Sequence, residues 1–433
     1  MSEVPHSGIE TLNTACTCIT LDVAALCRAA EAIVGDPAFC RELAETHPHL
    51  LSAQPMFLSA DHARQMRETI HAIETVARQP AYREAVLSYA PQIARIDTGP
   101  IGVFMGYDFH IGEIGPRLIE INTNAGGALI NAYLLMAQRA CCSEMEIAAG
   151  LPERISDIEQ HFVTSFRAEW KLLGRTGPLR SIAISDETPA AQYLYPEFVL
   201  FQRLFQKHGL TAVIAAPEEL TLKDGKQLWH ADQIIDLVYN RLTDFTLATP
   251  ASSALREAYL SHAAAITPNP RAHALFADKR NLVLLSDPAR LREIGIARDL
   301  IEALAGGIPR TELVSRAAAD DLWARRNKLF FSPCAGFGSK AAYRGDKITR
   351  KVWEDILSGS YVAQEIVPPS ARAISVDGVV HNMKVDLRNY AYAGDVQLVA
   401  ARIYEGQTTN FRTRGGGFAP VFVGQDAHCT SCA

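Results

Sequence analysis

The first quarter of the chain has the spacing of amphipathic helices. Between about Thr20 and Ala90, stretches such as DVAALCRAAEAIV, PAFCRELAETH and ADHARQMRETIHAIETVARQ are rich in Ala, Leu, Glu and Arg, and their apolar residues recur every three or four positions. That period places the apolar side chains on one face of a helix. The pattern therefore predicts an all-helical opening segment, which we assign to residues 1–98.

The pattern changes at DTGPIGVFMGYDFHIGEIGPRLIEINTNAGG, where glycines, aromatic residues and β-branched residues replace the alanines. This composition favours two strands joined by a Gly-rich turn. Helical spacing returns between about Ile155 and Leu173. Residues 99–177 are therefore predicted to form a segment of strands followed by a helix.

Residues 178–268 alternate between strand and helix patterns. LRSIAISD, LTAVIAAP and IIDLVYNRLTDF have the pattern of buried strands, and PEFVLFQRLFQKHG has the pattern of a helix between the first two. This order is typical of a parallel sheet covered by helices. A small parallel α/β domain is predicted here, and the Pro-rich stretch AITPNPRAHAL follows it.

The last third returns to a sheet pattern after two helices predicted between about Ala272 and Leu304. KLFFSPCAGFGSKAAYRG predicts a strand, a Gly-rich loop and a return strand. YVAQEIVPP and RAISVDGVVHNMKVDLRNYAYAGDVQLVAARIYEG predict further sheet with Asp-Gly and Ala-Gly-Asp turns. Residues 269–424 are taken as one unit, and residues 425–433, which end in CTSCA, are predicted to be a mobile tail.

Composition narrows the classes of protein. A length of 433 residues favours two or three packed domains, and no apolar run approaches the roughly 18 residues that cross a bilayer. A net charge of −6 with dispersed Lys and Arg argues against nucleic-acid binding. The N-terminus lacks the basic flank of a secretory signal, and nine scattered cysteines are poor material for a disulfide framework. A cytoplasmic protein is expected.

Two short strands carry pairs of polar residues. In LIEINTNAGG, Glu120 and Asn122 leave the same face of a strand, about 7 Å apart along the backbone. Their oxygens suit Mg²⁺, although a half-exposed strand end explains the pair as well. In MKVDLRNY, Asp386 and Arg388 also share a face. They are a candidate cation ligand and a candidate anion ligand, or a structural ion pair.

Three further stretches suit a nucleotide. The loop SPCAGFGSKAAYRG brings glycines and Lys340 that fit phosphate, or a tight hairpin. YVAQEIVPP places Gln364 and Glu365 where a strand can contact adenine, although a plain surface strand explains it too. TTNFRTRGGGFAPV places Arg412 and Arg414 before three glycines, which suits bidentate contact with carboxylate or phosphate on a closing loop. Together these stretches predict an ATP site.

The order of these motifs resembles that of the circularly permuted ATP-grasp enzymes, most closely the eukaryotic-type glutathione synthetase group. There an EINT strand precedes the rest of the ATP site, as IEINTNAGG does here. Further matches follow in order: Asp108 with Phe109, DLVYNR ending in Arg241, Lys279 in FADKRNL, the Gly-rich loop, the adenine strand and FRTR. The resemblance implies an α/β (α+β) ATP-grasp fold, circularly permuted. It adds a helical N-terminal segment, an inserted small parallel α/β substrate domain, and nucleotide-binding subdomains with a lid in residues 269–424.

The resemblance also implies roles for individual residues. Mg²⁺ would be bound by Glu120 and Asn122, with Asp386 as a substitute for an acidic ligand that the chain lacks. ATP would be contacted by Lys279, Lys328, Gly338, Ser339, Lys340, Gln364, Glu365 and Arg414. The substrate would be contacted by Asp108, Arg241, Asn410 and Arg412, with Arg412 and Arg388 as the catalytic cations.

Besides the missing acidic ligand, the chain departs from the family pattern at two further places. Ser332 in FFSP stands where the family has a lysine, so that phosphate contact is missing or comes from Lys328 or Lys340. The arginine that the family places just before the Asp108 position is absent as well. These changes argue against glutathione itself as the product.

The predicted function is ATP- and Mg²⁺-dependent joining of a carboxylate to an amine through an acylphosphate. This chemistry depends on positioning and electrostatics, which fits a sequence without an obvious Ser-His-Asp or Cys-His set. The expected partners are small carboxylates and amines, with no nucleic acid and no membrane, and a homodimer is compatible with them. The alternatives are a catalytically silent nucleotide-binding protein and an ATP-grasp phosphotransferase.

Overall fold

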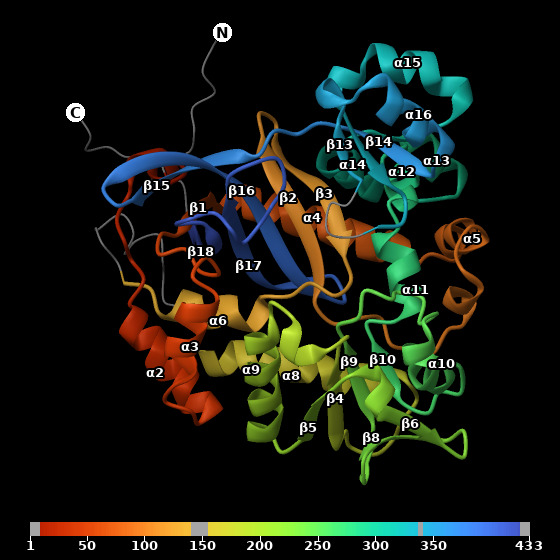
Figure 1. The fold of residues 1–433 in the computed structure, drawn as a ribbon. Coiled ribbons are helices and arrows are strands. Elements are labelled where there is room, and N and C mark those ends of the chain that lie inside the picture. Colours follow the sequence, from red (N-terminus) through yellow and green to blue (C-terminus); the bar gives the residue numbers. More distant parts are fainter. Residues whose placement is uncertain (1–8, 140–154, 337–340, 425–433) are drawn as a thin grey trace.

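The computed structural model of the chain describes residues 9–139, 155–336 and 341–424 (Figure 1). Its largest sheet has seven strands in the order β1-β18-β17-β16-β2-β3, with β15 also pairing with β16. Only β1 and β18 run parallel; the other neighbours are antiparallel. The strands are β1 (Met56–Ser59), β2 (Met105–Gly112), β3 (Gly115–Asn122), β15 (Ser370–Val376), β16 (Val379–Tyr392), β17 (Asp395–Tyr404) and β18 (Gly417–Gly424).

The opening segment contains the predicted helices α2 (Val23–Val34), α3 (Phe39–Thr46), α4 (Ala60–Ala77) and α5 (Pro80–Ser88), after the short α1 (Leu12–Ala15). It is not all-helical, because β1 interrupts it and pairs with β18, the last strand among the described residues. All four residues of β1 are buried. A short apolar run of this kind has no period that separates a buried strand from a helix, so only the distant partner decides its conformation.

A disulfide joins Cys27 in α2 to Cys40 in α3, with their Cα atoms 5.2 Å apart. The scattered cysteines gave no sign of it, because the pairing depends on how two neighbouring helices pack. Disulfides are uncommon in the reducing cytoplasm, so this pair does not favour the cytoplasmic placement expected from the sequence. Among the helices of the described ranges, none combines the length and the apolar character needed to cross a membrane.

The predicted parallel sheet is present, in the order β10-β9-β4-β5 with every pair parallel. Its strands are β4 (Ser181–Ser185), β5 (Thr211–Ala215), β9 (Leu237–Asn240) and β10 (Ala265–Thr267). A three-stranded antiparallel sheet that the sequence did not predict lies beside it, formed by β6 (Leu220–Lys223), β7 (Gln227–His230) and β8 (Gln233–Ile235). The helix α10 (Ser253–Leu260) packs against this part.

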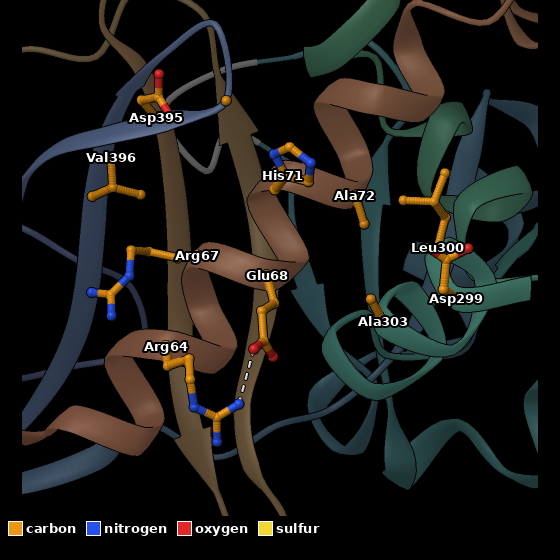
Figure 2. Close-up of a pocket in the computed structure, with 11 residues that line it drawn as sticks. Arg64, Arg67, Glu68, His71, Ala72, Asp299, Leu300, Ala303, Asp395 and Val396 are labelled. Atoms are coloured by element: carbon orange, nitrogen blue, oxygen red, sulfur yellow. Dashed lines mark hydrogen bonds and ion pairs between the residues drawn. The ribbon is translucent and has the colours of Figure 1, made fainter. Parts of the chain in front are cut away.

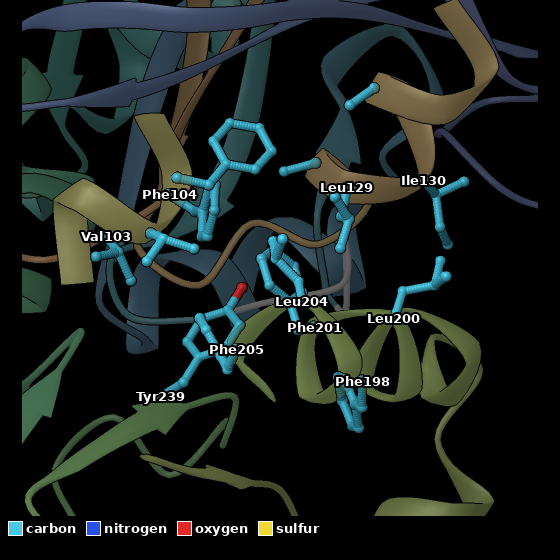
Figure 3. Close-up of a cluster of buried hydrophobic side chains, with 14 of the residues drawn as sticks. Val103, Phe104, Leu129, Ile130, Phe198, Leu200, Phe201, Leu204, Phe205 and Tyr239 are labelled. Atoms are coloured by element: carbon cyan, nitrogen blue, oxygen red, sulfur yellow. The ribbon is translucent and has the colours of Figure 1, made fainter. Parts of the chain in front are cut away.

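An aromatic core joins the parallel sheet to the main sheet. The helices α6 (Ala128–Met136), α8 (Ile155–Leu172) and α9 (Tyr195–Lys207) lie between them and contribute to it. Phe104 contacts the rings of Phe162, Phe201 and Tyr239 at centroid distances of 4.8 to 5.9 Å, within the range of favourable aromatic pairs. Figure 3 shows Phe104 and Tyr239 facing the row of side chains on α9.

A smaller antiparallel sheet, in the order β11-β14-β12-β13, lies at the other end of the main sheet (Figure 1). Its strands are β11 (Thr311–Leu313), β12 (Leu329–Pro333), β13 (Tyr343–Arg344) and β14 (Tyr361–Glu365), and α15 (Ala319–Ala324) and α16 (Arg350–Ser358) cover it. The predicted strand and return strand are β12 and β13, which pair antiparallel. The predicted strand YVAQE is β14.

The two helices predicted between Ala272 and Leu304 are instead several shorter ones. They are α11 (Pro270–Ala272), a π-helical turn over His273–Ala277, α12 (Arg280–Leu285), α13 (Pro288–Glu293) and α14 (Arg298–Gly307). Asp287 caps α13 just before a proline, and Gly295 ends it with a φ of 80°. Proline and glycine stop helices at these points, and the apolar period alone does not show it.

Candidate active site

A cavity lies between the main sheet and the small antiparallel sheet. Its walls come from β2, β3, β16 and β17 on one side and from β12 and β14 on the other, with Lys279 at the start of α12. Six residues predicted from the sequence line it together: Asp108, Glu120, Lys279, Gln364, Glu365 and Asp386. Asp108 and Glu120 are far in sequence from the other four residues, so the fold brings the predicted set to one place.

Glu120 and Asn122 lie on the same side of β3, as the strand geometry predicted. The amide nitrogen of Asn122 donates to Glu120 Oε1 at 3.2 Å, and the Nζ of Lys279 lies 3.2 Å from Glu120 Oε2. Burial would raise the pKa of Glu120, but Lys279, the bond from Asn122 and the nearby arginines outweigh it and lower the pKa to about 2. The side chain is 36% exposed and is ionised at neutral pH.

Asp108 is the centre of a buried charge cluster. Arg388 on β16 binds it with two bonds, from Nε at 2.7 Å and from Nη2 at 2.6 Å. Arg402 on β17 donates from Nη2 to the same carboxylate at 2.8 Å and from Nε to Asp386 at 2.6 Å. Burial disfavours both guanidinium charges, yet the carboxylates hold the pKa of Arg388 and Arg402 above their usual range.

The register of the sheet explains why these charges meet. Arg402 on β17 is directly opposite Asp386 on β16, and Arg388 on β16 is opposite Asp108 on β2. Asp108 is in turn opposite Glu120 on β3. Because paired residues on neighbouring strands point to the same face, the cluster follows from the pairing of four strands. Arg388 itself is not part of the cavity wall, so the ion-pair alternative describes its contacts, and a catalytic role for it stays a prediction.

The sequence did not mark Arg402, Thr409 or His110, which also line the cavity. Thr409 donates its hydroxyl to the second oxygen of Asp386, and the Nδ1–H of His110 donates to the carbonyl of Val367 at 2.7 Å. Burial lowers the pKa of His110, so its ring is neutral at neutral pH. The signal that was available is a charged residue inside the apolar strand pattern LVAARIY, since such a residue needs a buried partner.

A divalent cation fits part of the predicted ligand set. The carboxylate of Glu120 is partly exposed to the cavity. Among the described residues, the side chain of Asn122 bonds only through its amide nitrogen, so its oxygen is available to a cation. Asp386 is different, because Arg402 and Thr409 engage its two oxygens. Within the described residues, no group of three or more His, Cys, Asp and Glu side chains is placed to hold a metal ion.

The predicted nucleotide contacts are only partly in the cavity. Gln364 is buried there and donates to Thr311 at 3.3 Å, and Ser332, which replaces the expected lysine, lines the same wall. Lys328 is exposed and is not part of the cavity wall. Gly338, Ser339 and Lys340 of the Gly-rich loop lie outside the described residues.

Arg241 lies in a second polar cluster beyond the loop that follows Asn122. It donates to the carbonyl of Asn124 at 2.6 Å and packs against Gly126, where a Cβ atom would lie 2.6 Å from its Nη2. Glu197 accepts bonds from Gly127 and Leu129 at the start of α6. This close approach explains why glycine follows the EINT strand. Arg241 is absent from the wall of the cavity, and its substrate role stays a prediction.

The loop between β17 and β18 closes one side of the cavity with Gln407, Thr408 and Thr409. Asn410 shapes the loop: it donates to the carbonyls of Glu405 and Thr408 and accepts from the backbone of Arg412. The other loop arginine, Arg414, pairs with Asp377 at 2.7 Å, and both are exposed, as is Arg412. Neither loop arginine lines the cavity.

A second hollow lies on the outer face of the molecule, between α4, α14 and the β16–β17 turn (Figure 2). Figure 2 shows Arg64 paired with Glu68 there, and Arg67, His71, Asp299 and Asp395 also line the hollow. None of the residues predicted for the ATP site lines it. The cavity between the sheets is therefore the candidate active site.

Comparisons with known proteins bear on the fold. No family model and no curated protein matches the chain. Among solved structures, a glutathione synthetase-like effector from Globodera pallida in its apo form matches with a TM-score of 0.58 and 12% identity, over 94% of this chain and 98% of that chain. A putative gamma-glutamylcysteine synthetase from Methylobacillus flagellatus KT matches with a TM-score of 0.45 and 11% identity, over 83% and 87%. The ATP-grasp ligase PsnB with its minimal precursor matches with 0.28 and 17%, over 53% and 78%.

The first of these matches covers almost the whole of both chains, so the chain has a glutathione synthetase-like fold, as the resemblance implied. At 12% identity the likeness concerns the fold alone. The mixed α/β class is confirmed as well. The circular permutation, the division into domains and the role of each site residue stay predictions.

Proposed function

We propose that the protein is an ATP- and Mg²⁺-dependent ligase that joins a carboxylate to an amine through an acylphosphate. The observation that carries the proposal is the ion pair of Glu120 and Lys279 inside the cavity, at 3.2 Å and 159 residues apart in sequence. It brings the predicted metal strand and the predicted phosphate lysine into contact. The glutathione synthetase-like fold supports the same chemistry as an analogy.

The chemistry needs charge stabilisation more than proton transfer. A carboxylate oxygen attacks the γ-phosphorus of ATP and ADP leaves; an amine then attacks the acyl carbon, loses a proton and expels phosphate. Lys279 would hold phosphate oxygens during the first step, and a cation at Glu120 and Asn122 would offset the developing charge. Arg412, on the loop that closes the cavity, is our candidate for holding the substrate carboxylate or the tetrahedral oxyanion. The substrates of the enzyme would be small carboxylates and amines.

A phosphate-release assay on pairs of amino acids and dipeptides tests the proposal, with mass spectrometry of the product. ADP should form only when a carboxylate and an amine are both present. Glu120→Gln and Asn122→Ala should each abolish turnover while far-UV circular dichroism stays unchanged, and Glu113→Gln, an exposed acid on the same hairpin, should keep it. Wild-type rates in both site variants would refute the metal role.

The position of Ser332 favours a second candidate, a nucleotide-binding protein without turnover. This side chain lies in the cavity wall where the resemblance expects a phosphate-binding lysine. Tight ATP binding with no ADP from any substrate pair would support that alternative. ADP with a stable phosphorylated product and no need for an amine would instead indicate a phosphotransferase.

A further inference from the structure

Arg402 occupies the place where the predicted metal ligand Asp386 would meet a metal. It lines the cavity from β17 with its side chain 12% exposed. Its Nε lies 2.6 Å from Asp386 and its Nη2 lies 2.8 Å from Asp108. The guanidinium thus bridges two carboxylates that are 5% and 2% exposed, as a bound cation would.

The protein already satisfies both of these carboxylates. Asp386 accepts from Arg402 on one oxygen and from Thr409 on the other. Asp108 accepts from Arg388 on both oxygens, and one of them also accepts from Asn122 and Arg402. A metal ion at either acid would have to displace a guanidinium and leave it buried without an anion, which is strongly unfavourable.

Glu120 has a different environment. Its partners within the described part of the chain are one amide and one lysine, each at 3.2 Å, and its side chain is 36% exposed. The ammonium of Lys279 is a point charge on a flexible stem, so it can turn from Glu120 to a phosphate oxygen. Of the acids in the cluster, Glu120 is therefore the one that a divalent cation can reach without breaking a buried ion pair.

The charges of the cluster balance before any ligand binds. Asp108, Glu120 and Asp386 supply three negative charges, and Lys279, Arg388 and Arg402 supply three positive charges. The donors on Nη1 of Arg402 have no protein partner among the described residues, because its bonds use only Nε and Nη2. Such a fork of free N–H groups in a cavity wall suits a phosphate oxygen.

We propose that Arg402 replaces a metal ion at Asp108 and Asp386. The cavity then binds a single divalent cation, at Glu120 and Asn122, and Arg402 contacts a phosphate of the nucleotide through Nη1. The inference rests on the proposed function for the presence of a nucleotide, but it concerns the number of cations and their ligands. It removes Asp386 from the predicted metal ligands and gives it the role of a positioning residue that orients Arg402.

The number of bound cations can be measured with Mn²⁺ as the probe. Electron paramagnetic resonance counts the bound Mn²⁺ ions on the full chain at saturating ADP. One bound Mn²⁺ per chain is expected, retained in Asp386→Asn and lost in Glu120→Gln. This readout requires no turnover. Two bound Mn²⁺ per wild-type chain, or loss of Mn²⁺ in Asp386→Asn with the fold intact, would overturn the inference.

Arg402 itself is tested by its effect on nucleotide affinity. Arg402→Met should weaken ADP binding in calorimetry by about tenfold or more, since a charged hydrogen bond is lost. Arg402→Lys keeps the charge and should recover part of the affinity, and an unchanged affinity in both variants would overturn the phosphate contact. ADP formation with a carboxylate and an amine, together with two Mn²⁺, would overturn this inference alone. A wild-type chain that binds neither Mn²⁺ nor nucleotide overturns the proposed function as well.

Discussion

The chain uses two pairs of arginines in opposite ways. Arg388 and Arg402 sit on β16 and β17, are 10% and 12% exposed, and bind buried carboxylates. Arg412 and Arg414 sit on the loop after β17 and are exposed, and the partner of Arg414 is an aspartate that is 64% exposed. The first pair is held between buried strands, whereas the second pair is exposed on a loop.

The difference follows from what burial costs a charge. A buried guanidinium is tolerated only with full hydrogen bonding, so Arg388 and Arg402 have little freedom to follow a ligand. An exposed ion pair is worth about 0 to 1 kcal/mol, and a ligand carboxylate can replace the partner of such an arginine. We call the buried pair, Arg388 and Arg402 with their carboxylates, the buried frame of the site. We call the exposed loop with Arg412 and Arg414 its adaptable part. The two use the same residue type in two environments.

The largest expected effect is on the buried frame. Asp108→Asn leaves Arg388 and Arg402 buried without their shared anion, so the free energy of unfolding should fall by about 3 to 5 kcal/mol. The matched control is Asp377→Asn, which removes the exposed partner of Arg414 and should cost less than about 0.5 kcal/mol. Urea denaturation followed by circular dichroism measures both, and equal costs would contradict the contrast between the two pairs.

A second prediction concerns the adaptable part. If Arg412 stabilises the oxyanion of the proposed reaction, Arg412→Ala should lower kcat/KM by about 10² to 10³. Its unfolding free energy should stay within about 0.5 kcal/mol of wild type, because the side chain is exposed. Steady-state kinetics with the substrate pair found by the screen gives the first value. Normal kinetics would mean that Arg412 is a solvated loop residue.

The loop itself provides a third prediction, intermediate in size. Asn410→Ala removes the side chain that bonds Glu405, Thr408 and Arg412, and should lower the unfolding free energy by about 1 to 2 kcal/mol. Asn410→Asp keeps the acceptor and loses the donors, so a smaller loss is expected. Denaturant unfolding of the two variants checks the order, and no loss in either would show that the loop holds its shape without Asn410.

The last prediction concerns how the stability contributed by Glu120 depends on pH. Its folded pKa of about 2 lies below the unfolded value, so the ionised carboxylate stabilises the folded chain above the unfolded pKa. That contribution should disappear as the pH falls through about 2. The difference in Tm between wild type and Glu120→Gln should therefore be full at pH 6 and shrink from about pH 4.5 downward. A constant difference from pH 6 to pH 3 would contradict it.

Local geometry was predictable from the sequence, and contacts across strands were not. The pairs Glu120 with Asn122 and Asp386 with Arg388 each share a face because strand side chains alternate, and the structure has both arrangements. The contact of Arg402 with Asp386 depends on the register of β16 against β17, which no spacing within one strand reveals. Arg412 and Arg414 were noticed because they belong to the motif FRTR, whereas Arg402 lies in a strand that contains no such motif.

Dependence on distant contacts also explains the errors in the predicted fold. MFLS was taken as part of a helical segment because its strand partner, Val421 to Gly424, lies at the other end of the chain. The breaks in the helices after Ala272 come from Pro288 and Gly295, which interrupt a helical period that continues on either side of them. The Cys27–Cys40 disulfide likewise depends on packing between helices. Patterns within about ten residues were informative. Pairings between different elements were not, whether they are 13 residues apart, as in the disulfide, or hundreds, as in β1 and β18.

The pairing of β1 with β18 has a consequence for how the protein is made. β1 ends at Ser59 and its partner ends at Gly424, so the ribosome must add more than three hundred residues before this edge of the main sheet can close. At about 5 to 20 residues per second, the early strands wait roughly 20 to 70 seconds for their neighbours. During that interval the apolar side chains of Met56, Phe57 and Leu58 lack the cover of the finished sheet. The newly made chain is therefore expected to depend on chaperones until β18 emerges.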